Sequence, residues 1–307
     1  MENVNEAIEC AGEGGEVVFP AGILEVDGFT NLFNDQIWTL DRNTQLLRSA
    51  TTAGPILAMT APKLTIRGGV FDGNRGVNNV QTVGIAGEAQ HSLDIRGATI
   101  RNVAGWGIAF DDGKLVVDEC SFSNVGYSAI IWLCTSRAPD GSVRYGPKIT
   151  RCEINHAIGY AGEPGICLKG GLNGSNNQFQ GAEVSGCRIR MPGTSHYSNV
   201  GVELTFGQRS RVINNDVLAA RIAYSFGHMA ASVMTGNTSS AICDYAHELV
   251  DSETNTVSGN ASTGIAGSIG MVRISGASRY NRGGGNAASS FPSTVSDVSS
   301  YPSLNTF

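Results

Sequence analysis

The middle of the chain holds side chains that can donate and accept protons. Lys169 and Glu203 lie in two similar apolar segments, and His196 and Tyr197 fall between them. An amine or an imidazole can act as a general base, and a phenol can act as a general acid. We therefore expect proton-transfer chemistry in which Lys169 or His196 is the base and Tyr197 is the acid. Glu203 would either orient the lysine or hold a calcium ion.

A second set of residues suits the binding of a charged, ring-shaped ligand. Arg144 and Arg209 carry guanidinium groups, which pair well with carboxylates. Trp132 offers a flat ring against which a ligand can stack, and Asp111 and Tyr145 complete the set of candidate binding residues.

Each of these residues also has an ordinary structural explanation. Lys169 and Glu203 can form a surface ion pair without catalytic meaning. His196 can be a solvated loop residue, and Trp132 can pack against a loop. Asp111 is followed by Asp-Gly, a sequence that suits a tight turn.

The composition of the chain favours many short strands over long helices. Of 307 residues, 40 are glycine, while aromatic residues make up 7% and charged residues 16%. Gly, Asn, Ser, Thr, Val and Ile dominate, which is typical of strands joined by tight turns. The formal charge of −6 argues against a general nucleic-acid binder. No apolar run reaches the roughly 18 residues that span a bilayer, and the N-terminus lacks the pattern of a signal peptide. We therefore expect no nucleic-acid partner, no membrane partner and no signal peptide in this chain.

An internal repeat is the clearest pattern in the sequence. One recurring position is small in the first half of the chain and asparagine in the second: Gly69, Ala98, Cys120, Cys152, Cys187, Asn215, Asn237 and Asn260. The intervals along this column are 29, 22, 32, 35, 28, 22 and 23 residues. The basic turn is therefore about 22 residues, and the longer turns carry insertions. Successive turns of a β-solenoid lie about 4.8 Å apart, so stacked asparagines can hydrogen-bond along the column. The pattern predicts an all-β fold, a single right-handed parallel β-helix, in which the three cysteines are small buried thiols.

The two ends of the chain differ from the repeat. Residues 3–11 place Val4, Ala7, Ile8 and Ala11 at helical spacing, which predicts a short helix that caps the first turn. Residues 276–307 are rich in Gly, Ser and Pro, which predicts an extended tail after a β-helix domain of residues 1–275.

Two short motifs connect the repeat to a known superfamily. GGEVVFPAG (14–22) resembles the first-turn motif of pectate-lyase-like β-helices, and GGVFDGN (68–74) resembles a turn that is common in the same superfamily. With the repeat, the resemblance covers residues 5–265. The superfamily includes polysaccharide lyases, polygalacturonase-like hydrolases, uronan epimerases and phage tailspike depolymerases. The catalytic motifs of polygalacturonases and alginate epimerases are absent from the sequence.

The insertions locate the expected groove. The third strand of successive turns would point one column of side chains outward: Ala109, Ile131, Cys167, Glu203, Ser225 and Glu248. A neighbouring outward column begins with Asp111, Leu133, Lys169 and Thr205. Four insertions flank these strands, at residues 134–147, 158–164, 170–181 and 191–199. Long loops in a tight solenoid usually carry function, so we expect a groove around Lys169 and Glu203.

The resemblance implies an enzyme that acts on an acidic polysaccharide such as alginate. The first expectation is a lyase that cleaves by β-elimination, with Arg144 or Arg209 on the uronate carboxylate. A glycoside hydrolase remains open, because Glu203 and Glu248 lie two turns apart, and Asp111 could replace one of them. A binding protein or phage adhesin without catalysis also remains open. The superfamily further implies an extracellular or phage-associated protein that is a monomer or a homotrimer.

Overall fold

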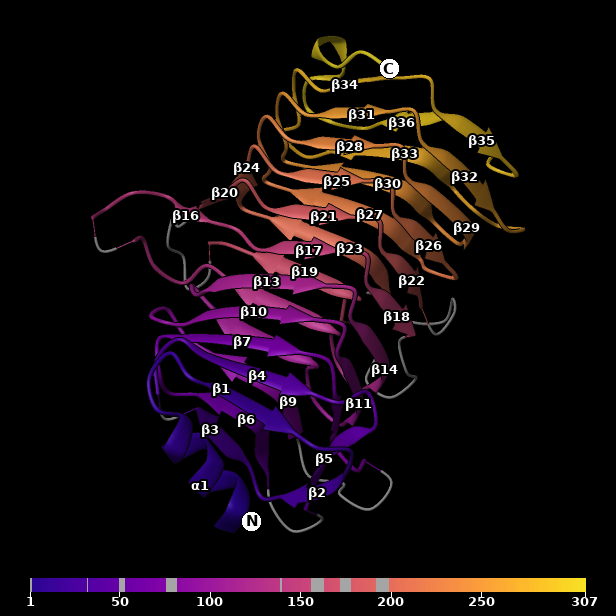
Figure 1. Ribbon diagram of the computed structural model, residues 1–307. Helices are drawn as coiled ribbons and strands as arrows, with labels where there is room; N and C mark the ends of the chain where they lie inside the picture. The colour runs from indigo at the N-terminus through magenta and orange to yellow at the C-terminus, as the bar shows by residue number, and fades with distance from the viewer. Residues whose placement is uncertain are drawn as a thin grey trace.

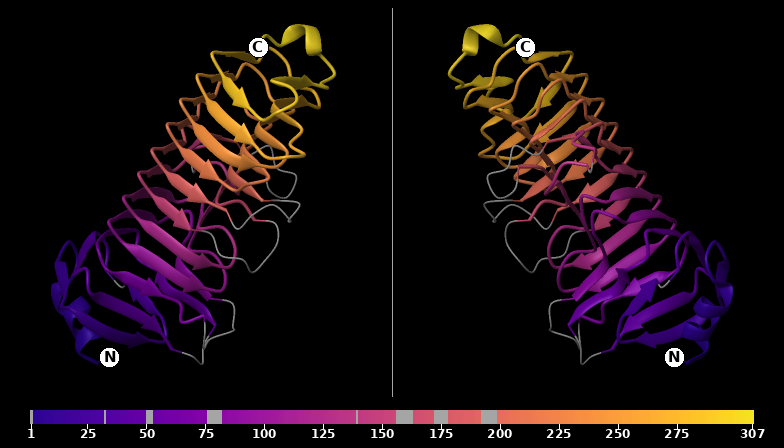
Figure 2. Two further views of the ribbon diagram at one scale, coloured as in Figure 1. Left: turned by 90° about the vertical axis from the view of Figure 1, so that its right-hand side faces the viewer. Right: turned by 90° about the vertical axis from the view of Figure 1, so that its left-hand side faces the viewer.

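The chain winds into a right-handed parallel β-helix whose turns stack from the N-terminus to the C-terminus (Figure 1). Two side views show an elongated molecule with its termini at opposite ends (Figure 2). The computed structural model describes residues 2–31, 33–49, 53–75, 82–138, 140–155, 163–171, 178–191 and 199–307. This part of the chain contains no helix long and apolar enough to cross a membrane.

Each turn contributes one strand to each of three parallel sheets, which enclose the core. Within the described residues each sheet has 11 strands. Sheet A contains β1 (Glu16–Phe19), β4 (Gln36–Leu40), β7 (Lys63–Arg67), β10 (Ser92–Arg96), β13 (Lys114–Asp118), β17 (Lys148–Thr150), β21 (Glu183–Ser185), β25 (Arg211–Ile213), β28 (Val233–Thr235), β31 (Thr256–Ser258) and β34 (Arg282–Gly284). Sheet B contains β2 (Gly22–Val26), β5 (Thr44–Arg48), β8 (Val70–Asp72), β11 (Thr99–Val103), β14 (Ser121–Val125), β18 (Glu153–Asn155), β22 (Arg188–Arg190), β26 (Asp216–Leu218), β29 (Thr238–Ile242), β32 (Ala261–Gly264) and β35 (Ala287–Ser289).

Sheet C forms the third side of the tube. It contains β3 (Phe29–Asn31), β6 (Gly54–Met59), β9 (Thr82–Gly87), β12 (Ile108–Asp111), β15 (Ile130–Leu133), β19 (Ile166–Lys169), β23 (Val200–Thr205), β27 (Ile222–Gly227), β30 (Tyr245–Val250), β33 (Gly270–Ser275) and β36 (Val295–Asp297). Where the chain passes from sheet C back to sheet A, β16 (Arg144–Tyr145), β20 (Phe179–Gln180) and β24 (Gly207–Gln208) form a small fourth sheet, D. Sheet D thus widens one corner of the tube beside the centre of sheet C.

The predicted repeat is confirmed by the strand register. In sheet A, Ile95 pairs with Val117, Val117 with Ile149, and Val184 with Val212. These side chains are buried because alternate residues of each strand point into the tube. The large aromatic side chains of the core follow the same alternation, including Phe110, Trp132 and Tyr224, which are 0–1% exposed.

The asparagine column forms a continuous hydrogen-bonded ladder at the turn from sheet A to sheet B. Asn215 Nδ2 donates to Asn237 Oδ1 at 3.1 Å, and Asn237 Nδ2 donates to Asn260 Oδ1 at 3.1 Å. The residue before each of these asparagines adopts a left-handed conformation, as Asn214 does with φ of 54°. The ladder therefore satisfies polar groups that the tight turn would otherwise leave buried without partners.

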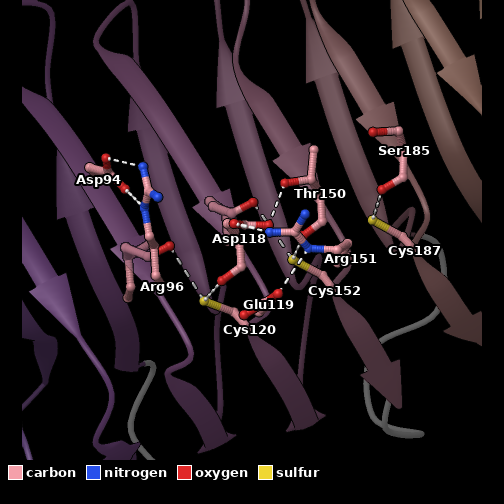
Figure 3. Close-up of polar contacts among 12 residues, drawn as sticks. Asp94, Arg96, Asp118, Glu119, Cys120, Thr150, Arg151, Cys152, Ser185 and Cys187 are labelled. Carbon is pink, nitrogen blue, oxygen red and sulfur yellow. Dashed lines mark hydrogen bonds and ion pairs between the residues drawn. The ribbon is translucent and has the colours of Figure 1, made fainter.

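Earlier turns place cysteines at the same position. Cys120, Cys152 and Cys187 are 1–2% exposed, so the prediction of small buried thiols is confirmed. Figure 3 shows the thiols in successive turns, and Cys120 and Cys152 each donate to a backbone carbonyl two residues earlier at 3.3 Å. Charged side chains such as those of Asp118 and Arg151 pair on the outer face of sheet A instead.

The N-terminal cap is confirmed as helix α1 (Glu2–Ala11), which buries Ile8 against the first turn. At the other end, composition predicts a tail, but β34, β35 and β36 pair with the preceding strands and continue the sheets. A second asparagine ladder explains this difference, because Asn281 Nδ2 donates to Asn305 Oδ1 at 3.2 Å. After β36 the chain forms a short 3₁₀ helix, η2 (Pro302–Leu304).

Candidate active site

The outer face of sheet C carries the two predicted columns in register. Pairing along the sheet aligns Ala109, Ile131, Cys167, Glu203, Ser225 and Glu248. It also aligns Asp111, Leu133, Lys169 and Thr205. This register places Lys169, Glu203 and Glu248 on neighbouring turns of one face.

Lys169 and Glu203 meet on adjacent turns. Lys169 Nζ lies 3.6 Å from Glu203 Oε1, and the two side chains are 35% and 20% exposed. Burial disfavours the charged amine, but the neighbouring Cys167, Glu203 and Glu163 together raise the pKa of Lys169. Lys169 is thus held as an ammonium ion at neutral pH, which suits it to neutralise a carboxylate rather than to accept a proton.

Burial disfavours the charged form of Glu203 as well, and for a carboxyl group this means a higher pKa. Desolvation raises the pKa of the Glu203 carboxyl, and the charges of Glu163 and Glu248 add to this effect. Lys169 opposes the shift but does not cancel it. A carboxyl with a raised pKa stays protonated at higher pH, as a general acid requires.

A second carboxylate lies two turns further along the same column. Glu248 accepts hydrogen bonds from Ser225 Oγ at 3.2 Å and from Arg273 Nη1 at 2.9 Å. Ser225 stands between Glu203 and Glu248, and Gly227 follows on the same strand, so the outward positions of the intervening strand carry only small residues. The two glutamates therefore lie on either side of β27, whose outward side chains are small.

Glu163 joins this group from the segment that precedes β19. Its Oε2 accepts a hydrogen bond from the buried Ser128 hydroxyl at 3.1 Å. The described residues contain no group of three or more His, Cys, Asp or Glu side chains that could hold a metal ion. Lys169 already occupies one oxygen of Glu203, so these residues give no fit for the calcium ion considered for Glu203.

Two residues expected to bind the ligand have structural roles. Trp132 is 0% exposed, and its indole N–H donates to the Gly113 carbonyl at 2.7 Å. The prediction that it stacks on a ligand is wrong, because alternation turns Trp132 inward between two outward neighbours. Arg144 is also corrected: its side chain is 13% exposed, and Nε lies 3.2 Å from Asp112 Oδ1. That guanidinium is not available to bind a substrate carboxylate.

The other candidates lie apart from the glutamates. Asp111 is exposed at the end of β12, where desolvation and the carboxylates of Asp112 and Glu88 raise its pKa. Tyr145 is 75% exposed on β16, and Arg209 is exposed after β24. His196 and Tyr197 lie outside the described residues, so their assigned roles stay predictions.

Sequence reasoning missed a histidine ring that stacks on a phenylalanine ring at the corner beside sheet C. The rings of Phe206 and His228 are parallel within 12°, with centroids 4.2 Å apart. His228 Nε2 lies 3.6 Å from Asp251 Oδ2, and all three residues line a hollow of about 580 Å³. Phe206, His228 and Asp251 each come directly after a strand of sheet C. The alignment of third strands that located Glu203 could therefore have identified this column as well.

Comparisons with known proteins establish the fold of this chain. No family model and no curated protein matches the sequence. The A-module of mannuronan C-5 epimerase AlgE4 from Azotobacter vinelandii is similar in structure, with a TM-score of 0.62, 14% identity, and coverage of 95% of this chain and 91% of that one. ORF18 of Geobacillus virus E2 gives a TM-score of 0.64 at 13% identity, covering 98% of this chain and 58% of that one. An exopolygalacturonase from Thermotoga maritima gives 0.57 at 11% identity, covering 96% and 85%. At these identities the likeness shows a shared fold.

Proposed function

Because the chain has the fold of the pectate-lyase-like β-helices, we propose that it hydrolyses a glycosidic bond of a polysaccharide bound across the outer face of sheet C. In this proposal Glu203 donates the proton to the leaving oxygen, and Glu248 activates water as the general base. The observation that carries the proposal is the raised pKa of the half-buried Glu203 beside a second carboxylate in the same column.

The spacing of the two glutamates supports an inverting reaction. Two turns separate their backbones by about 10 Å, since adjacent strands lie about 4.8 Å apart. Inverting hydrolases hold their carboxyl groups about 6.5–9.5 Å apart, which leaves room for the attacking water. The backbone separation lies just above this range, and Glu248 reaches toward Glu203 as far as Ser225 Oγ on the intervening strand. The outward residues of the intervening strand, Ser225 and Gly227, are small, and Arg273 Nη1 contacts Glu248 Oε1 at 2.9 Å.

A lyase is the second candidate, and Lys169 is the observation that favours it. Its ammonium group can neutralise the carboxylate of a uronate before proton abstraction. However, the raised pKa of Lys169 makes it a poor general base, so elimination would need another residue as the base. Neighbours of this fold include proteins named as an epimerase and as an exopolygalacturonase, which supports a carbohydrate substrate by analogy only.

Incubation with a panel of polysaccharides tests the reaction directly. Alginate, polygalacturonate, glucuronan, hyaluronan and neutral glucans are each treated while ultraviolet absorbance and new reducing ends are recorded together. We expect new reducing ends without absorbance, because hydrolysis leaves saturated ends. Rising ultraviolet absorbance would identify β-elimination and change the assignment to a lyase. If neither signal appears with any polymer, the hydrolase proposal fails and a binding protein gains support.

The pH profile of a Lys169 variant tests the role of Glu203. Lys169 lowers the pKa of Glu203, so the change Lys169→Met should raise that pKa further. A general acid must be protonated, and activity is therefore lost as pH rises through its pKa. The alkaline limb of kcat against pH should thus move to higher pH in Lys169→Met. An unchanged alkaline limb would mean that another group is the acid.

A further inference from the structure

A second hollow lies at the corner between sheets C and A, away from the glutamates. It has a volume of about 690 Å³, and residues 142–146 of the insertion after β15 form one wall. The strand pair β16–β20, which carries this wall, projects beside sheet A in Figure 1. Polar side chains that line the hollow include Gln90, Ser92, Lys114, Tyr145 and Lys148. Glu203, Glu248 and Lys169 are not among its described lining residues.

The wall of this hollow is fixed by the buried Asp112. Ser136 Oγ donates to Asp112 Oδ2 at 2.8 Å, and the backbone N–H of Thr135 donates to Oδ1 at 2.7 Å. Burial alone would raise the pKa of Asp112, but these hydrogen bonds hold it below its ordinary value. Arg144 bridges to the same carboxylate and to the Ser136 carbonyl at 2.9 Å. The loop is therefore tied to the preceding turn immediately before Tyr145.

Tyr145 stands at the end of this fixed wall with its ring open to solvent. Its side chain is 75% exposed, and its backbone pairs with Gln180 on the next turn. A rigidly mounted aromatic ring that nothing covers is a common feature of ligand-binding surfaces, because it offers flat apolar area at little entropic cost. The position of Tyr145 is thus set by backbone pairing while its face stays available.

The charge of the hollow is positive. Lys114 and Lys148 are exposed at the starts of β13 and β17, and neither forms an ion pair with a described residue. Asp112 is the acidic residue among the described lining residues, and Arg144 neutralises it. Two unpaired ammonium groups therefore face a concave surface beside an exposed ring, in a chain whose net charge is −6.

We propose that this hollow is a second glycan-binding site, which holds a sugar unit bearing a carboxylate or a sulfate. The sugar ring lies against Tyr145, and its anionic group lies between Lys114 and Lys148. The choice of a glycan as the ligand rests on the proposed function, whereas the requirement for an anionic group rests on the two lysines alone. A polymer bound here is anchored by a unit other than the one that reacts on sheet C.

Binding measurements on a Glu203→Gln background test the site without requiring turnover. Affinities for polygalacturonate, dextran sulfate and uncharged dextran are measured at low and high salt. The two acidic polymers should bind more tightly than dextran, with affinity that falls as salt rises. Tyr145→Ala and the double variant Lys114→Ala, Lys148→Ala should each weaken acidic-polymer binding about ten-fold.

Matched surface variants separate this site from general charge and aromatic effects. Tyr280→Ala removes another tyrosine that is 50% exposed, and Lys63→Ala removes a lysine that is 53% exposed. Both controls should leave the affinities unchanged. Equal binding by Tyr145→Ala and its parent, or failure of both acidic polymers to bind, would overturn the proposal. Hydrolysis is not part of this readout, so a failure of the proposed reaction would be recognised separately in the polysaccharide panel.

Discussion

Replacing Glu203 with glutamine should reduce kcat by about 10²–10⁴-fold, the usual contribution of a general acid. Glutamine keeps the shape of the side chain but cannot deliver a proton to a leaving oxygen. Polymer binding should change much less, since the amide still fills the same position beside Lys169. Initial rates and binding isotherms of the purified variant, compared with those of the parent chain, separate the two effects.

Glu183→Gln is the matched control for this variant. Glu183 also points outward from a strand, but on sheet A, where its carboxylate accepts a hydrogen bond from Ser185 Oγ at 2.8 Å. Its replacement should leave kcat within about two-fold of the parent value, as expected for a surface change remote from the chemistry. Equal losses in both variants would indicate general damage to the fold, and full activity in Glu203→Gln would remove Glu203 from the mechanism.

Asn237→Ala should lower the free energy of unfolding by about 3–5 kcal/mol, because it leaves several buried polar groups without partners. Asn237 is 0% exposed, and its side chain donates to the Val212 carbonyl at 2.8 Å and to Asn260 Oδ1 at 3.1 Å. It also accepts from the backbone N–H of Asn215 at 3.0 Å. Urea titrations followed by circular dichroism measure the loss.

The end of the same ladder provides a graded control. Asn286 is only half-buried, and its side chain continues the ladder beyond Asn260 without a further asparagine after it. Asn286 makes three side-chain hydrogen bonds, but its half-buried position lets water replace part of them. Asn286→Ala should therefore cost about 1–2 kcal/mol, clearly less than Asn237→Ala. If both variants lose the same stability, the ladder does not act through buried partners, and our account of the turn is wrong.

The sequence predicted the features that repeat along the solenoid. The asparagine and cysteine column and the outward columns on sheet C all appear in register. These features are recoverable because each turn must place like residues above like, so that one position carries the same physical demand many times. The adjacency of Lys169 and Glu203 followed from the same alignment.

The features that do not repeat were harder to predict. Arg144 was assigned to a ligand because its partner, Asp112, lies 32 residues earlier and belongs to another turn. Trp132 could have been placed correctly, since its neighbours Ile131 and Leu133 were already assigned to the outer face. Glu163 lies before its strand and outside the alternating pattern, and no residue spacing indicated that it would reach the electrostatic environment of Glu203.

The unequal lengths of the turns affect how the sequence of such a protein can evolve or be engineered. Along the asparagine and cysteine column the spacing ranges from 22 to 35 residues, yet the three sheets keep their pairing throughout. Stacking forces act between adjacent turns, and the extra residues fall between the strands in the sequence rather than within them. Ligand preference can therefore change through the insertions while the stacked columns stay constant. Whole turns become units that evolution or an engineer can duplicate, delete or exchange.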